Sequence, residues 1–384
     1  MIKSFLFRLI LNFNILSKIN IYIFILTLTI NCSSTVENIN NIIKEEESLS
    51  SLLNNKMPEG YDLSKTIRIY FATNRKTVGA PICGDTFYSI QSDAELRFGI
   101  CDINVPFFHD IGNLDFDPAK GRDLSFLFQY HKLINKDLLL SSLGRNPSSE
   151  IIVFVHGFNV KFEEAILRSA QIKYDLKFSG DVVLYTWPAG AEEGLLNKFL
   201  INDTYNLNFQ NAKNSRAYFK TFFLNILESK KKVHLIVHSM GHQVVIPVIN
   251  EIYREKNNKF IEELVLNAPD YDSREFMQIV NNLKSSSRRI TVYCSPGDNA
   301  LVASSKVNSN KRVGSCEKIN GIDMINVNPV DAPFLGIGGL GHGYYSSRPV
   351  LTDLFQVILG IDAPKRLFIR QSSQDNAENY VLRR

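Results

Sequence analysis

From residue 65 onward, the sequence alternates short runs of β-branched and apolar residues with stretches whose apolar residues recur every three or four positions. The first pattern is typical of buried strands and the second of amphipathic helices. EIIVFV at 150–155 is a run of the first kind, and a stretch of the second kind follows at 162–176. Such alternation predicts an α/β fold with a mostly parallel central sheet and helices on both faces.

The pattern places the individual elements. We expect strands at 66–73, 96–105, 150–155, 181–187, 233–237, 264–267, 289–294 and 322–327. We expect helices at 162–176, 217–227, 275–283 and 349–359, and one that begins near Met240. Ligands of such sheets bind beyond the carboxyl ends of the strands, so polar residues at strand ends are the candidates for chemistry.

The first 31 residues have a different character from the rest of the chain. Basic residues precede the uncharged run IYIFILTLTI at 21–30. This run is about half of the roughly 20 residues that a spanning helix needs. A cleaved signal peptide that comprises residues 1–31 is therefore favoured over a permanent membrane span. Cys32 stands where a bacterial lipoprotein signal places its lipidated cysteine, although Asn31 is larger than the usual preceding residue. We expect an exported, membrane-anchored lipoprotein, periplasmic or at the cell surface; a plain secretory signal or an uncleaved anchor is the alternative.

Composition divides the remainder of the chain. Residues 32–64 are rich in Ser, Asn and Glu and predict a flexible tether, 65–369 predict one folded domain, and 370–384 predict a disordered tail. With 45% hydrophobic residues the chain can build a large core. Its formal net charge is only +4, and it has no basic stripe with interleaved aromatic residues, so nucleic acid is not an expected partner.

Four cysteines remain besides Cys32. An even number in an oxidising compartment permits two disulfides, and the pairs closest in sequence are Cys83 with Cys101 and Cys294 with Cys316. Unpaired thiols in the core are the alternative. No Cys/His spacing resembles a zinc site, so we expect no metal.

The stretch KVHLIVHSMGHQVV at 232–245 contains a strand that ends at a serine. A serine on a tight turn between a buried strand and a helix projects from the sheet, and the adjoining helix N-terminus stabilises negative charge beside it. Ser239 is therefore the candidate nucleophile, with a helix N-cap as its alternative role. The pentad VHSMG departs from the usual G-x-S-x-G, because Val237 replaces the first glycine.

A serine hydroxyl needs a base within hydrogen-bond reach, oriented by a carboxylate. Only His242 and His342 follow Ser239 in the chain. His242 lies within the helix after the turn, so its side chain points back along that helix. His342, in the glycine-rich loop GIGGLGHGYY at 336–345, is the expected base.

Three acidic residues at strand ends compete to orient the base, namely Asp270, Asp298 and Asp331. Asp298 follows a strand and a Pro-Gly turn in SPGDNAL, and we prefer it. Asp270 is the alternative acid, and its other expected role is to cap the next helix, which starts near Ser273.

An oxyanion hole is the remaining requirement, and one donor of this kind is worth roughly 3–4 kcal/mol of transition-state stabilisation. FVHGFN at 154–159 ends a strand, and its glycine lets a backbone N–H turn inward. The expected donors are the amides of Phe158 and Met240. His156 and His238 are then expected in the scaffold or the pocket wall.

Seven motifs follow one another along the chain, namely YFATNR (70–75), FVHGFN, YTWPAG (185–190), VHSMG, LNAPDYD (266–272), SPGDNAL (295–301) and GHGYY (341–345). This ordered set resembles the alpha/beta hydrolase family of unknown function DUF900, over about residues 66–369. The resemblance implies an alpha/beta-hydrolase fold and places the serine, acid and histidine roles on Ser239, Asp298 and His342. Asn208 stands where relatives often have aspartate, and Pro247 falls inside the nucleophile helix.

The expected activity is hydrolysis of carboxylic esters through an acyl-enzyme, without a metal or organic cofactor. A lipid anchor at Cys32 would make acylglycerols or phospholipids reasonable substrates and the membrane a partner. Two alternatives remain open. One is a membrane-anchored binding protein on a hydrolase scaffold without catalysis, and the other is a thioesterase or peptidase with the same triad.

Overall fold

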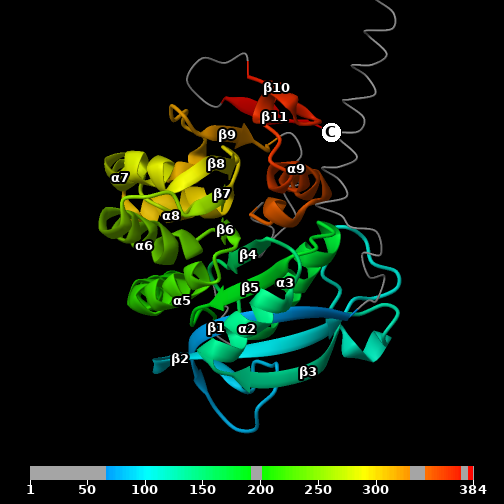
Figure 1. The fold of residues 1–384 in the computed structure, drawn as a ribbon. Coiled ribbons are helices and arrows are strands. Elements are labelled where there is room, and N and C mark those ends of the chain that lie inside the picture. Colours follow the sequence, from blue (N-terminus) through cyan, green and yellow to red (C-terminus); the bar gives the residue numbers. More distant parts are fainter. Residues whose placement is uncertain (1–65, 192–200, 329–341, 373–378, 384) are drawn as a thin grey trace, which may run out of the picture. The chain divides into compact units, whose positions relative to one another are not determined.

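The computed structural model describes residues 66–191, 201–328, 342–372 and 379–383, all within one compact unit, Gly60–Arg384 (Figure 1). The expected signal peptide, Cys32, the expected tether and Asp331 lie outside the described residues. Among the helices that the structure describes, none is both long enough and apolar enough to cross a membrane.

An eleven-stranded sheet organises the described residues (Figure 1). Its central strands pair in parallel, whereas β2 and β3 at one edge and β10 at the other pair antiparallel with their neighbours. Across the sheet the strands are β10 (Ile369–Gln371), β11 (Tyr380–Leu382), β9 (Asp323–Asn326), β8 (Ser287–Cys294), β7 (Ile261–Asn267), β6 (Lys232–His238), β4 (Glu150–Val155), β5 (Asp181–Thr186), β1 (Thr66–Thr77), β2 (Tyr88–Asn104) and β3 (Leu127–Ile134).

Helices cover both faces of the sheet. One core contains side chains from α2 (Lys136–Arg145), α5 (Arg216–Glu228), α6 (Gly241–Lys256) and α7 (Ser273–Ser286). A second core contains side chains from α3 (Phe162–Asp175), α8 (Asn299–Asn308) and α9 (Arg348–Ile358). α4 (Ile201–Asn214) packs on α5 and α6. Short 3₁₀ turns are η1 (Pro118–Lys120), η2 (Val313–Ser315), η4 (Tyr344–Ser346) and η5 (Ala363–Lys365).

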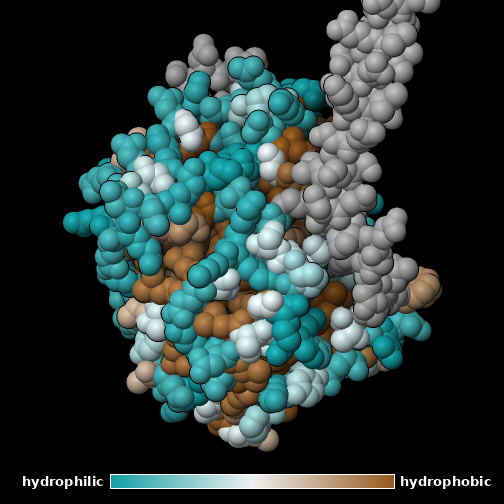
Figure 2. Space-filling model, viewed as in Figure 1, coloured by the Kyte–Doolittle hydropathy of each residue, from teal (hydrophilic) through white to brown (hydrophobic). Residues whose placement is uncertain are grey.

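The central strands read as continuous apolar runs because both of their faces are buried. In β4, Ile151, Val153 and Val155 enter the first core, whereas Ile152 and Phe154 enter the second. Side chains of a strand alternate between the two faces of a sheet, so every position of such a strand is apolar. On the face seen in Figure 2, hydrophilic residues cover most of the surface and hydrophobic residues show in smaller patches between them.

Each expected strand and helix is present, with ends shifted by a few residues; β2 is extended most, because it begins at Tyr88. The sequence reading missed α2, β3, α4 and α8, in addition to the two short strands at the C-terminal end. β3 is an edge strand whose positions are all half-buried or exposed, so its apolar signal is weak.

The prediction of a disordered tail over 370–384 is wrong for the part that the structure describes. Gln371 pairs with Tyr380, and Val381 pairs with Asn326 of β9, so this segment adds two short strands to the edge of the sheet. Leu382 is buried in the second core. Three-residue strands in a polar context carry too little pattern to be recognised, and the folded domain therefore extends beyond residue 369.

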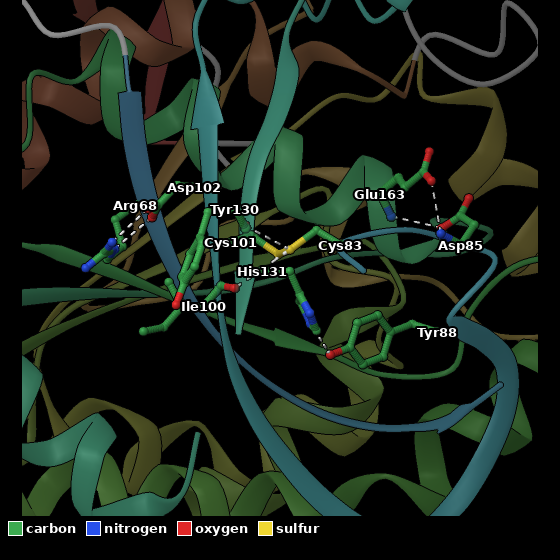
Figure 3. Close-up of a disulfide and its surroundings, with 10 residues drawn as sticks. All are labelled: Arg68, Cys83, Asp85, Tyr88, Ile100, Cys101, Asp102, Tyr130, His131 and Glu163. Atoms are coloured by element: carbon green, nitrogen blue, oxygen red, sulfur yellow. Dashed lines mark hydrogen bonds and ion pairs between the residues drawn. A yellow bond between two sulfur atoms is a disulfide. The ribbon is translucent and has the colours of Figure 1, made fainter. Parts of the chain in front are cut away.

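Two disulfides join the pairs closest in sequence, Cys83–Cys101 and Cys294–Cys316. Figure 3 shows the first, which ties the loop after β1 to β2. Beside it, Asp85 and Glu163 each accept the other's backbone N–H, so this loop also caps the start of α3 (Figure 3).

Replacing either cysteine pair by serine lowers the free energy of unfolding. The bridges close loops of similar length, with sequence separations of 18 and 22 residues, so each loss is about 3 kcal/mol in the chain-entropy description. Urea denaturation of the two double variants measures it, and peptide mapping without reductant checks the pairing. Cross-linked peptides in any other combination would contradict the structure.

Candidate active site

Ser239 occupies a sharp turn between β6 and α6. Its φ of +51° lies in the left-handed region, which a residue other than glycine holds only when its surroundings fix it. The Ser239 N–H donates to the carbonyl of Asn267 at 2.9 Å, and its carbonyl accepts from the N–H of His242 at 3.1 Å. The end of β7 and the first turn of α6 thus hold the serine at the carboxyl edge of the sheet.

Two glycines allow this turn to approach the end of β4. A Cβ on Gly241 would lie 2.5 Å from the carbonyl oxygen of His156, and one on Gly157 would lie 2.7 Å from Cβ of Ser239. Val237, which replaces the first glycine of the usual pentad, is fully buried in the first core and pairs with Val155. The close contact with β4 therefore depends on glycines at 157 and 241 instead.

The structure brings Ser239, His342 and Asp298 together. Nε2 of His342 lies 2.6 Å from Oγ of Ser239, and Nδ1 lies 2.7 Å from Oδ2 of Asp298. An ionised carboxylate only accepts, so Nδ1–H donates to Asp298 and the neutral ring presents the Nε2 lone pair to the serine hydroxyl. All three residues are buried.

The backbone after β8 holds Asp298 in place. Its Oδ1 accepts the N–H of Leu301 at 3.1 Å, so the residue is the N-cap of α8 while its other oxygen faces His342. The N-terminus of a helix stabilises a carboxylate. Cys294, four positions before Asp298, forms a disulfide with Cys316, and the N–H of the next residue, Ser295, donates to the carbonyl of Gly314.

Asp270, the alternative acid, makes other contacts. Its carboxylate forms an ion pair with Arg312 at 3.1 Å and accepts hydrogen bonds from the hydroxyls of Ser304 at 2.5 Å and Tyr205 at 3.1 Å. The N-cap of α7 is Asp272, not Asp270. Together, the buried side chains of Asp270, Arg312 and Ser304 and the half-buried Tyr205 link α4, α8 and the loop after β7.

The other histidines near Ser239 remain neutral. Burial, and then the charge of Arg75, lowers the pKa of His156 to about 3, and burial lowers the pKa of His242 to about 3. Burial also lowers the pKa of His238 well below its ordinary value. The His238 ring stacks on Tyr345 with centroids 3.8 Å apart. Among the described residues, none of these three rings makes a hydrogen bond to the Ser239 hydroxyl. The partner of that hydroxyl is His342.

Trp187 packs in the interior. It is fully buried, its ring stacks on His156 with centroids 5.3 Å apart, and its Nε1–H donates to the His156 carbonyl at 3.0 Å. The side chain therefore supports the loop after β4.

Two backbone amides adjoin the serine. Met240 lies directly before α6, and Phe158 follows Gly157 at the end of β4. Within the ranges that the structure describes, neither N–H donates to an acceptor. Both amides are thus available to a negatively charged oxygen, and the one at Met240 lies at a helix N-terminus. Among the described residues no group of three or more His, Cys, Asp or Glu side chains could hold a metal ion.

Sequence reasoning assigned no structural role to two residues that support this region. Arg75, at the end of the YFATNR motif, is fully buried, and Asn208 bonds to the loops at Asn159 and Gly190. For Arg75 the sequence carried no clear signal, because a charged residue near the end of a strand is usually exposed. Asn208 lies in a helix that the sequence reading did not identify.

A mostly parallel sheet with helices on both faces and a strand–turn–helix at its carboxyl edge defines an alpha/beta hydrolase. The model of the family described as alpha/beta hydrolase of unknown function (DUF900) matches residues 132–360, more than half of the chain, and the chain belongs to this family. No curated protein and no solved structure matches the chain significantly. The predictions of fold class and family are confirmed.

Gly241→Ala destabilises the protein because the added methyl group meets backbone atoms that cannot move aside. We expect a loss of about 1–3 kcal/mol in the free energy of unfolding, measured in urea. Gly144→Ala is the matched control, since its Cβ would meet nothing within 4 Å on the exposed side of α2. The control gains about 0.5–1 kcal/mol from higher helix propensity. Equal effects at the two positions would contradict the close packing of the turn.

Proposed function

We propose that this protein is a serine hydrolase that cleaves carboxylic esters through a triad of Ser239, His342 and Asp298. The observation that carries the proposal is the 2.6 Å contact between Nε2 of His342 and Oγ of Ser239, with Asp298 on the opposite ring nitrogen. A base on the hydroxyl and a carboxylate behind the base are the two requirements for serine as a nucleophile.

In the first half of the reaction, Oγ of Ser239 attacks the ester carbonyl carbon while its proton passes to Nε2 of His342. The carbonyl oxygen becomes negatively charged, and the amides of Phe158 and Met240 donate to it. When this intermediate collapses, the bond to the alcohol oxygen breaks and His342 returns the proton to the leaving alcohol. The products are the free alcohol and an acyl group bound to Ser239.

In the second half, water takes the place of the alcohol. His342 removes a proton from the water as its oxygen attacks the acyl carbon, and the same amides hold the second oxyanion. Collapse releases the carboxylic acid and returns the proton to Ser239. Every proton that is taken up is returned within the cycle, so the chemistry needs no metal and no organic cofactor.

The surroundings of His342 support its assignment as the base. His342 contacts a buried carboxylate at 2.7 Å, and that contact stabilises the imidazolium that forms during each step. His156, His238 and His242 are held neutral by burial. Of these four imidazoles, the one of His342 is therefore placed to take the proton of Ser239.

Lipid esters, such as acylglycerols or phospholipids, are the substrate class that we assign within this proposal. The assignment rests on the expected lipid anchor at Cys32, which would hold the domain at a membrane as an exported lipoprotein. A non-catalytic binding role on the same scaffold, or thioester or amide cleavage by the same triad, are outcomes that the following experiment distinguishes.

A fluorophosphonate probe labels the wild-type protein, and Ser239→Ala and His342→Gln each abolish labelling because the nucleophile or its base is lost. Hydrolysis of p-nitrophenyl esters of increasing chain length, with matched thioesters and amides, ranks the substrate class. A folded wild-type protein that takes up no probe would favour the binding role. Faster thioester or amide cleavage would replace the ester assignment.

Asp298→Asn and Asp270→Asn separate the two candidate acids. Asparagine at 298 keeps the cap of α8 but favours the wrong histidine tautomer, so kcat falls by roughly 10⁴. Asparagine at 270 leaves Arg312 buried without its carboxylate and lowers the free energy of unfolding by about 3–5 kcal/mol, while kcat of the folded protein changes far less. The reverse pattern of turnover would move the acid role to Asp270.

A further inference from the structure

Arg75 is a buried cation whose hydrogen bonds go to neutral groups. It is 0% exposed at the end of β1. Its guanidinium donates to Oγ1 of Thr186 at 3.0 Å and to the carbonyl of Val160 at 2.8 Å. It also donates to the carbonyls of Ala189 at 2.9 Å and Ser89 at 3.2 Å. The side chain thereby ties β1 to the loops that follow β4 and β5. Burial lowers its pKa to about 9, which still leaves it charged at neutral pH.

Groups that can only donate or only accept fix the direction of the hydrogen bonds at both ends of this series. A guanidinium has no acceptor, so the Thr186 oxygen accepts from Arg75. Nε2 of His156 lies 2.9 Å from that same oxygen, and Nδ1 lies 3.0 Å from the carbonyl oxygen of Gly157. The carbonyl can only accept, so Nδ1 carries the proton. Since the ring is neutral, Nε2 is bare and the Thr186 hydroxyl donates its hydrogen to it.

The last bond of this series acts on the peptide between Gly157 and Phe158. A trans peptide is planar, and its C=O and N–H point in opposite directions. The described residues contain no cis peptide bond. Because the Gly157 carbonyl is held on the side of His156, the N–H of Phe158 points away from that ring. In the proposed reaction, this N–H is one of the two that donate hydrogen bonds to the oxyanion.

The next peptide is held as well. The N–H of Asn159 donates to Oδ1 of Asn208 at 3.2 Å, and the same oxygen accepts the N–H of Gly190 at 2.9 Å. The Phe158 amide therefore lies between two anchored points. A Cβ on Gly157 would lie 2.7 Å from Cβ of Ser239, so a rotation of this peptide changes the position of a donor directly beside the nucleophile.

We infer that Arg75, Thr186 and His156 form a positioning relay that sets the direction of the Phe158 N–H in the oxyanion hole. The inference rests on the proposed function, because the amide acts only if an oxyanion forms at Ser239. None of the three side chains touches the reacting atoms in this scheme. Each acts through the next: Arg75 holds the Thr186 oxygen, the Thr186 hydroxyl donates to Nε2 of His156, and Nδ1–H of that ring holds the Gly157 carbonyl.

Thr186→Val tests the relay, since valine keeps the shape of the side chain and removes the hydroxyl. We expect kcat to fall by roughly 10- to 100-fold, less than for outright loss of a donor, with KM nearly unchanged. The affinity of a trifluoromethyl ketone, which forms an oxyanion on Ser239, should fall in parallel. Thr186→Ser should restore both. Thr291→Val is the matched control, because it removes a fully buried strand hydroxyl that has no hydrogen-bond partner among the residues that the structure describes.

The outcomes separate the relay from the reaction on which it depends. A wild-type protein without turnover or probe labelling overturns the proposed function and the relay with it. An active wild type whose kcat is unchanged by Thr186→Val overturns the relay alone. A second measurement is independent of turnover: ¹⁵N-histidine NMR, assigned by the signal lost in His156→Gln, should find the proton of His156 on Nδ1. A proton on Nε2 would overturn the relay.

Discussion

The parallel pairing of β4, β6, β7 and β8 is the constraint on which the site depends. Parallel neighbours end at the same edge of the sheet, so the loops after them meet although they are far apart in sequence. The amide of Phe158 follows β4, Ser239 follows β6 and Asp298 follows the turn after β8. A register shift in any of these pairs would separate the groups, and burial of the strands beneath the site fixes that register.

Burial then decides which polar groups can change charge. Three histidines around Ser239 are buried, and their pKa values lie far below the ordinary value, so their rings serve as fixed dipoles. His342 is also buried, but it shares a hydrogen bond with the carboxylate of Asp298. The same low-dielectric interior thus suppresses charge at most imidazoles and leaves one where a charge can form beside its counter-ion.

The sequence predicted the sheet well because strands buried on both faces carry a strong signal, as in EIIVFV. It also singled out Ser239, because this residue ends a buried strand, and His342, because only two histidines follow that serine; the structure brings both together with Asp298. It could not distinguish Asp298 from Asp270 by spacing, because the contact of Asp270 with Arg312 joins elements that only the fold brings together. Edge strand β3 and helix α4 were missed for a related reason. Their partners, rather than their own periodicity, hold them in place.

The asparagine at 208 has a physical consequence for the site. Its Oδ1 accepts from Gly190 and Asn159, and its Nδ2 donates to the carbonyls of Gly190 at 2.9 Å and Thr204 at 2.8 Å. An ionised aspartate could accept the first two bonds but could donate neither of the others. It would also place a buried negative charge behind the loop whose amide is proposed to hold an oxyanion, and like charges oppose each other strongly there. The neutral amide anchors the loop from α4 without that repulsion.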